Sequence, residues 1–108
     1  MSEDIKGLVK RIKNTGQRYI EKLLTTGVIE AGATAWYLGN DNEDDEFKAT
    51  EDGRFEFIGT AKARFHDLAE ADRTEATLRR VHSGDDRVTV HRLNGGDTIA
   101  VTVTITVE

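Results

Sequence analysis

Three histidines and a run of carboxylates are the residues of this chain whose side chains could do chemistry. His66, His82 and His91 lie far apart in the sequence, whereas zinc motifs place pairs of ligands a few residues apart. Ser83 follows His82 directly, which is typical of a turn, because the members of a catalytic triad usually come from separate loops. We therefore expect a protein without catalytic residues, cofactor or metal ion, and keep metal binding by the histidines as an alternative.

The carboxylates are concentrated in residues 40–46, where five of seven positions are Asp or Glu. A calcium-binding EF-hand loop needs Gly at its sixth position and Glu at its twelfth. Counted from Asp41, these positions hold Glu46 and Asp52, so the motif fails. The pattern predicts a hydrated acidic loop and leaves loose cation binding open.

Residues 1–27 are expected to form a basic amphipathic helix. Their apolar residues recur every three or four positions, which places them on one face. Asn14-Thr15-Gly16 interrupts this face, so a kink or two shorter helices are also compatible with the sequence. Gly27 lies where the helix is expected to end, because Gly is common just past a helix C-terminus. The apolar residues of the face are Ile5, Leu8, Val9, Ile12, Tyr19, Ile20, Leu23 and Leu24.

Beyond the helix the apolar pattern changes to a period of two, which indicates β-strands. Residues 33–38 are expected to form a strand, and residues 47–51 and 54–65 a hairpin around the turn dipeptide Asp52-Gly53. In residues 54–65 every second residue is apolar or Gly and is expected to face the core. The small residues among them leave room for the N-terminal helix to pack across this strand.

A crossover follows, with a short helix expected near residues 66–74. Residues 75–82 contain helix-forming Ala, Glu, Leu and Arg, but lead directly into a turn and a strand. We assign residues 75–82 to a strand and keep a helix as the alternative. The last two strands are expected at residues 87–93 and 98–107, joined by a turn at residues 94–97.

Residues 98–107 form the strongest strand pattern in the chain and are expected to reach a partner. They alternate Ile or Val with Thr or Ala and contain no charge and no Pro. Monomers usually protect a strand edge with Lys, Pro or a bulge, so an unprotected strand favours pairing with another chain. Coverage of this edge by the chain's own N-terminal helix is the alternative. The hairpin partner, residues 87–93, is also shorter, which leaves the end of the last strand unpaired. The candidate interface residues on this strand are Thr98, Val101, Val103, Ile105 and Val107.

Charge is distributed unevenly along the chain. Residues 6–22 hold six Lys or Arg and one Glu, whereas residues 23–108 hold nine basic and 17 acidic residues. The opposite signs favour contact between the basic helix of one copy and the acidic body of another, for which Lys10, Lys13 and Arg18 are candidates. A nucleic-acid-binding regulator that uses the same helix is the alternative, although the formal net charge of −5 disfavours general phosphate binding.

The length of 108 residues corresponds to one domain. The order of elements predicts an α+β fold in which the N-terminal amphipathic helix packs on an antiparallel β-sheet or a small β-barrel. Residues 33–108 are expected to be mainly antiparallel β-structure. The chain has no Cys, no apolar run of the length of a membrane span and no signal-peptide pattern, so we expect a soluble, cytoplasmic protein that binds no membrane.

Residues 53–92 resemble the central part of small head–tail connector (adaptor, stopper or completion) proteins of tailed viruses. A strand that ends in Ala63-Arg64-Phe65 is followed by a polar crossover and by a strand of alternating Val at residues 87–92. The long N-terminal helix is similar to the leading helix of other neck and tail-completion components. The resemblance implies a non-enzymatic, ring-forming homo-oligomer that contacts other virion proteins and assembles in the host cytoplasm.

The composition resembles that of proteins from salt-loving microbes. After residue 22 there are only two Lys, Lys48 and Lys62, and the chain contains 13 Thr. A carboxylate-rich surface keeps a protein hydrated and soluble. Together with the resemblance to connectors, this composition implies a tailed virus of a halophilic host.

Overall fold

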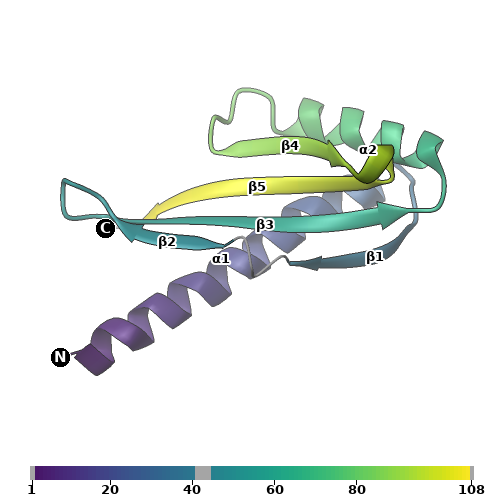
Figure 1. The fold of residues 1–108 in the computed structure, drawn as a ribbon. Helices are drawn as coiled ribbons and strands as arrows, with labels where there is room; N and C mark the ends of the chain where they lie inside the picture. Colours follow the sequence, from purple (N-terminus) through teal and green to yellow (C-terminus); the bar gives the residue numbers. More distant parts are fainter. Residues whose placement is uncertain (1, 41–44, 108) are drawn as a thin grey trace.

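The computed structural model describes residues 2–40 and 45–107. Two helices lie on one face of a five-stranded antiparallel sheet, which confirms the expected α+β fold (Figure 1). The sheet stays open and does not close into a barrel, because its outermost strands β1 and β4 do not pair with each other. The elements in chain order are α1 (Ser2–Glu30), β1 (Ala35–Asn40), β2 (Glu46–Ala49), β3 (Phe55–Phe65), α2 (Leu68–Val81), β4 (Val88–Leu93), the short 3₁₀ helix η2 (Asn94–Gly96) and β5 (Thr98–Val107).

The sheet is organised around β3, its longest strand. One edge of β3 pairs with β5 along its whole length, from Arg64 opposite Thr98 to Phe55 opposite Val107. The other edge pairs with β1 in its second half and with β2 in its first half. Since β4 pairs with the far edge of β5, the strand order is β1-β3-β5-β4. The hairpin expected between the second and third strands is confirmed, with Ala49 opposite Phe55.

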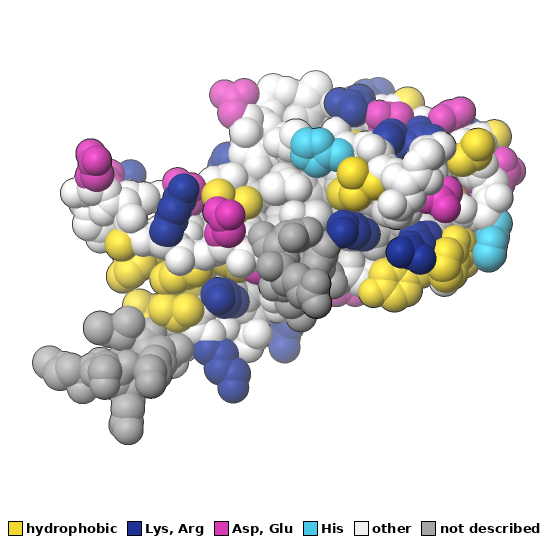
Figure 2. Space-filling view, in the orientation of Figure 1, with side chains coloured by type: hydrophobic (Ala, Val, Ile, Leu, Met, Phe, Trp, Pro, Cys, Tyr) yellow, Lys and Arg dark blue, Asp and Glu magenta, His cyan; other side chains and the backbone are white. Residues whose placement is uncertain are grey.

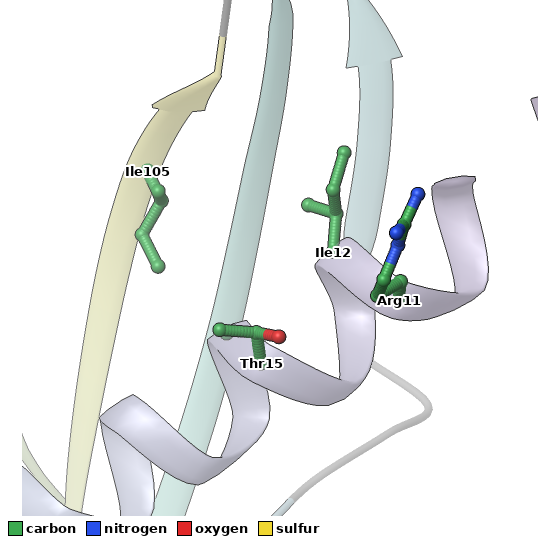
Figure 3. A pocket seen from close by; sticks show the side chains of 5 residues that line it. Arg11, Ile12, Thr15 and Ile105 are labelled. Carbon is green, nitrogen blue, oxygen red and sulfur yellow. The ribbon is translucent and has the colours of Figure 1, made fainter.

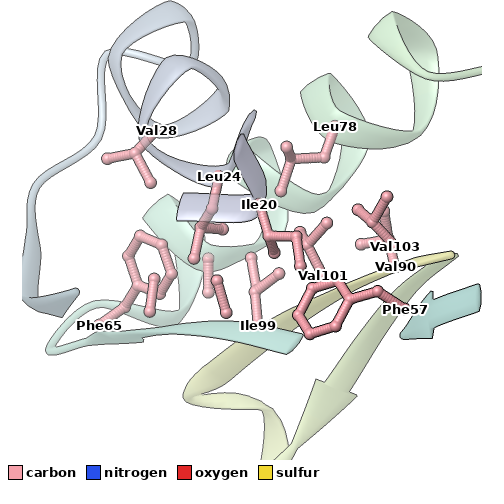
Figure 4. Close-up of a cluster of buried hydrophobic side chains, with 13 residues drawn as sticks. Ile20, Leu24, Val28, Phe57, Phe65, Leu78, Val90, Ile99, Val101 and Val103 are labelled. Atoms are coloured by element: carbon pink, nitrogen blue, oxygen red, sulfur yellow. The ribbon is translucent and has the colours of Figure 1, made fainter. Parts of the chain in front are cut away.

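The hydrophobic core lies between the helices and the covered face of the sheet (Figure 4). The alternation expected along β3 is confirmed, because every second residue from Phe57 to Phe65 is buried while the residues between them are partly or fully exposed. The helix α1 crosses this face, as the small residues of β3 suggested. The buried core residues are Ile20, Leu24, Val28, Phe57, Ala61, Ala63, Phe65, Ala71, Leu78, Val90, Ile99, Val101 and Val103.

Two glycines allow α1 to approach its neighbours closely. A Cβ on Gly16 would lie 2.3 Å from the Phe57 ring, and a Cβ on Gly27 would lie 2.3 Å from Leu78 Cδ2. The interruption of the apolar face near Gly16 is therefore a point of close contact with the sheet. The helix does not break there, since α1 is one continuous α-helix from Ser2 to Glu30.

The end of α1 lies beyond Gly27, so the expected C-terminus of the helix is wrong. The N–H of Gly32 donates to Ile29 O at 3.0 Å, and the N–H of Ala33 donates to Val28 O at 3.1 Å. This pair of bonds, with Gly32 at a φ of 65°, is the Schellman arrangement that ends many helices. Gly27 instead serves the contact with α2.

The assignment of residues 75–82 to a strand is also wrong, because residues 75–81 complete α2. The Asp67 side chain caps α2 by accepting the Ala69 N–H at 2.9 Å. Glu75 and Arg79 form an ion pair at the i, i+4 spacing, with 2.9 Å between Oε2 and Nη2. The decisive feature is a buried stripe at helical spacing, formed by Ala71, Thr74 and Leu78.

The opposite face of the sheet is not covered by any helix of the described chain. It carries the alternate residues of β3, β5 and β4, among which Thr60, Thr102 and Thr89 form a row across the strands. The hydroxyl oxygens of Thr60 and Thr102 lie 3.1 Å apart. This face is the one seen in Figure 2, where uncharged polar side chains and backbone fill much of its centre.

Candidate interaction surfaces

Most of the interface candidates on the last strand are buried. Thr98, Val101 and Val103 are 1%, 0% and 1% exposed. The cause is the position of β5 between β3 and β4, which leaves neither edge free over residues 98–103. The expectation that these three residues meet a partner is therefore wrong, because they belong to the chain's own core. The hairpin of β4 and β5 alone could not reveal this, since the second neighbour of β5 comes from a distant part of the sequence.

The end of β5 is less enclosed. Ile105 is half-buried and pairs with Phe57, and Val107 pairs with Phe55. On the other edge of β5, pairing with β4 reaches only to Val103. The short hairpin partner expected from the sequence is thus confirmed, although β3 supplies a partner on the opposite edge.

The basic candidates on α1 remain accessible. Lys10 and Arg18 are exposed, and Lys13 is half-buried. They belong to the stretch from Ile5 to Ile20, which contains five Lys or Arg and no Asp or Glu. This side of the helix can therefore meet a negatively charged partner.

The first half of α1 diverges from the sheet (Figure 1). Leu8, Val9 and Ile12 are only half-buried, and Gly16 is the first buried residue among the described side chains of α1. We call residues 2–15 the arm. Its apolar stripe continues, at the same spacing, the stripe that the rest of α1 buries against the sheet.

A hollow of about 290 Å³ separates the base of the arm from the end of β5. Ile12 and Thr15 border it from the arm, and Ile105 borders it from β5 (Figure 3). Arg11 and Gly16 complete the lining, which is mostly apolar. Such a lining suits an apolar side chain of a partner better than a charged substrate.

An exposed aromatic cluster lies on the edge strand β1. Trp36 stacks on His66 with the ring centroids 5.3 Å apart, and the guanidinium carbon of Arg64 lies 5.6 Å from the Trp36 ring centroid. Trp36 and Tyr37 are 47% and 50% exposed. The register of β1 shifts between Ala35 and Tyr37, which indicates a β-bulge at Trp36. A bulge protects a strand edge, so we do not take β1 as the main assembly surface.

The three histidines do not converge. His66 stacks on Trp36, His82 lies at the C-terminus of α2, and His91 is exposed on β4. Within residues 2–40 and 45–107, no group of three or more His, Asp or Glu side chains could hold a metal ion. These positions therefore offer no shared site for acid–base or metal chemistry.

The Asp85 carboxylate, in the turn after α2, forms an ion pair with the Arg87 guanidinium. Arg87 Nε donates to Asp85 Oδ1 at 3.0 Å, and this side-chain hydrogen bond is the main cause that lowers the pKa of the Asp85 carboxyl. A carboxylate held in its charged form is a poor general acid. The turn that the sequence predicted after His82 is present.

Residues 41–44 of the acidic segment 40–46 lie outside the described residues. The loose cation binding left open for this segment is therefore not addressed by the structure. Asp45 has a structural position. It accepts hydrogen bonds from Gln17 Nε2 at 2.6 Å and from the Thr60 N–H at 3.3 Å. Thr60 lies between the parts of β3 that pair with β1 and with β2, so Asp45 satisfies the backbone in this gap.

In the described part of the chain, no helix is long and apolar enough to cross a membrane. The chain matches no family model, no curated protein and no solved structure. The function proposed below is therefore inferred from the surfaces of the molecule and from its sequence pattern.

Proposed function

We propose that the protein is a non-enzymatic structural protein that assembles with copies of itself into a ring. We further propose that the ring is a head–tail connector component in the virion of a tailed virus with a halophilic host. The observation that carries the proposal is the arm. A helix that leaves its own sheet with a half-covered apolar stripe favours a second surface that covers it.

The stripe is continuous along α1, but its two halves differ in burial. Ile20 and Leu24 are 1% and 0% exposed, whereas Leu8 and Ile12, at the same four-residue spacing, are half-buried. Removing apolar surface from water contributes about 25 cal/mol per Å². Covering the arm and the hollow beside it therefore favours association with another surface.

A second copy of the chain is the partner that the charges favour. The arm is basic, whereas residues 23–108 hold 17 acidic and nine basic residues. Two basic arms repel each other, whereas the arm of one copy and the acidic residues 23–108 of another copy, which we call the body, attract each other. Such a contact joins two different surfaces, so it repeats from copy to copy and closes into a ring when the rotation between neighbours allows it.

Support for a viral connector comes from the sequence. The region that resembles connector proteins, residues 53–92, covers β3, α2 and most of β4. The low Lys content and the many carboxylates after residue 22 support a protein that works in concentrated salt. In such salt, apolar contacts of the kind that the arm offers become stronger.

Sedimentation velocity over a range of protein concentrations, at about 0.15 M and about 2 M salt, tests the assembly. We expect an oligomer of defined size, which electron microscopy shows as rings. The double variant Leu8→Gln, Val9→Gln should shift the protein toward the monomer, because it makes the arm polar while preserving helix propensity. The control Asn14→Gln changes an exposed position of the same helix and should leave the oligomer intact.

A monomer at every concentration and both salt levels would overturn the proposal. If the monomer also binds DNA, with log affinity falling against log salt at a slope of about −4 to −5, the basic helix serves nucleic acid instead. That slope corresponds to about five phosphate contacts.

A further inference from the structure

We infer that the arm of one copy docks on the opposite end of the next copy, so that the assembly is head to tail. The inference rests on the proposed self-association and names its second surface. We call this surface the acidic end. It is formed where α1 ends, α2 begins and β4 turns into β5, and its principal residues are Ile29, Glu30, Asp67, Leu68, Asp72 and Leu93.

Three segments meet at the acidic end, at the opposite end of the molecule from the N-terminus (Figure 1). Glu70 of α2 reaches the segment after α1, where its Oε2 accepts the Thr34 N–H at 3.1 Å. The turn between β4 and β5 lies beside the start of α2, since a Cβ on Gly96 would be 3.9 Å from Leu68 Cδ2. The molecule measures 50 × 26 × 22 Å, so the arm and the acidic end are separated along its long axis.

Large apolar side chains are exposed at the acidic end. Ile29 is 71% exposed, Leu68 is 54% exposed and Leu93 is 37% exposed. A single exposed apolar residue is ordinary, but three at one end of a small protein indicate a contact surface. These three side chains can cover the apolar stripe of the arm, which the chain's own sheet covers only in part.

Exposed carboxylates outnumber exposed cations at the acidic end. The Asp72 side chain is 71% exposed, whereas that of its ion-pair partner Arg92 is only 22% exposed. Asp67, next to Leu68, is also exposed. Two cations of this region are exposed as well: Arg73, with 52% of its side chain accessible, and Arg64, which lies opposite Thr98 at the end of β3. Glu30, Asp67 and Asp72 are exposed against these two arginines, so the acidic end presents a net negative charge to an approaching arm.

The arm supplies the complementary chemistry. Lys10 and Lys13 flank the apolar residues Val9 and Ile12, so basic groups border the stripe as acidic groups border Leu68. Salt screens charges beyond about 3 Å at about 1 M. At high salt the apolar contact therefore supplies the affinity, and directly paired charges select the head-to-tail orientation.

Chemical cross-linking tests the docking, because the chain contains no Cys and every introduced thiol is unique. A mixture of the variants Val9→Cys and Leu68→Cys is treated with a short bis-maleimide. We expect a cross-linked heterodimer that joins the two variants. A mixture of Val9→Cys with Thr106→Cys is the matched control, since Thr106 is exposed at the other end of the sheet and should not react with the arm.

The outcomes separate the docking from the self-association. If the variants form oligomers but only the control pair cross-links, or Val9→Cys cross-links with itself, the acidic end is not the docking surface and self-association stands. If sedimentation shows only monomers and no cross-link forms, both proposals fail.

Charge reversal gives an independent readout at about 0.15 M salt. The double variant Lys10→Glu, Lys13→Glu should weaken self-association at least about tenfold, since it places negative charge against the acidic end. Mixing it with Asp72→Lys should recover a large part of the association. Asp72→Lys keeps an internal partner for Arg92, because Arg92 Nη1 also contacts Glu75 Oε1 at 3.0 Å. Failure of the mixture to associate would overturn the proposed orientation.

Discussion

The Asp45 carboxylate accepts a hydrogen bond from Gln17 Nε2 at 2.6 Å and so joins α1 to the gap between β1 and β2. Its second oxygen accepts the Thr60 N–H at 3.3 Å, on the edge of β3 that is left open between β1 and β2. One residue of the acidic segment thus has a role in the fold. Its charge serves a contact between helix and sheet.

Asp45→Ala should lower the free energy of unfolding by about 1–3 kcal/mol, because it removes the acceptor of the Thr60 N–H in a partly buried site and the contact that joins Gln17 to the sheet. Urea denaturation measures the change. Glu51→Ala, in the exposed turn between β2 and β3, is the control and should change the free energy by less than about 0.5 kcal/mol. Equal effects of the two substitutions would show that the Asp45 contact contributes little.

Gly16→Ala should destabilise the protein by up to about 2 kcal/mol, because the new methyl group meets the Phe57 ring at a cost of about 1–3 kcal/mol. This cost exceeds the gain of about 1 kcal/mol that Ala usually brings to a helix. Gly7→Ala is the matched control in the same helix, since no atom lies within 4 Å of its Cβ position. We expect Gly7→Ala to raise the melting temperature and Gly16→Ala to lower it.

Val103→Lys should prevent cooperative unfolding or lower the free energy of unfolding by about 3–5 kcal/mol, because it buries a charge without a partner. Val103 is 1% exposed and lies opposite Gly59 in the core face of the sheet. Thr106→Lys, on the exposed face of the same strand, should be nearly neutral. Thermal melting followed by circular dichroism distinguishes the two. A stably folded Val103→Lys variant would contradict the assignment of this part of β5 to the hydrophobic core of the single chain.

Asp85 should make a small contribution to stability that disappears in acid. Because the Arg87 hydrogen bond lowers the pKa of Asp85 from its usual 3.8, the contribution is present above pH 3.8 and is lost as the pH falls through the lower folded-state pKa. The difference in unfolding free energy between the wild type and Asp85→Asn should therefore shrink below pH 3.8. In an Arg87→Gln background the pH dependence of this difference should become smaller, because the side-chain hydrogen bond is lost while the backbone N–H of residue 87 still donates to Asp85 Oδ1.

Local pattern was sufficient for much of this fold. The period of apolar residues placed α1 over the small residues of β3, and Asp52-Gly53 identified the hairpin of β2 and β3. The same reasoning failed for residues 75–81, whose helical stripe depends on Leu78 meeting Gly27 of α1. That contact joins distant segments, and propensity alone did not decide between helix and strand.

The candidate surfaces were predictable only in part. The basic residues Lys10, Lys13 and Arg18 stood out because no acidic residue interrupts them. The acidic end did not, because the segment after α1, the start of α2 and the turn after β4 come together only in three dimensions. The sequence also did not predict that Val101 is buried within the chain. That burial depends on the pairing of β3 with β5, two strands far apart in the sequence, which no local pattern indicates.

In the proposed ring, the number of copies depends on the angle between the arm and the body. The continuous α1 has no hinge at Gly16, so the direction of the arm is fixed where Gly16 meets Phe57 and Gly27 meets Leu78. A ring closes only when the rotation from one copy to the next divides a full turn, and otherwise the same contact produces an open helical filament. The symmetry of the assembly therefore depends on two contacts inside each copy as much as on the surface between copies.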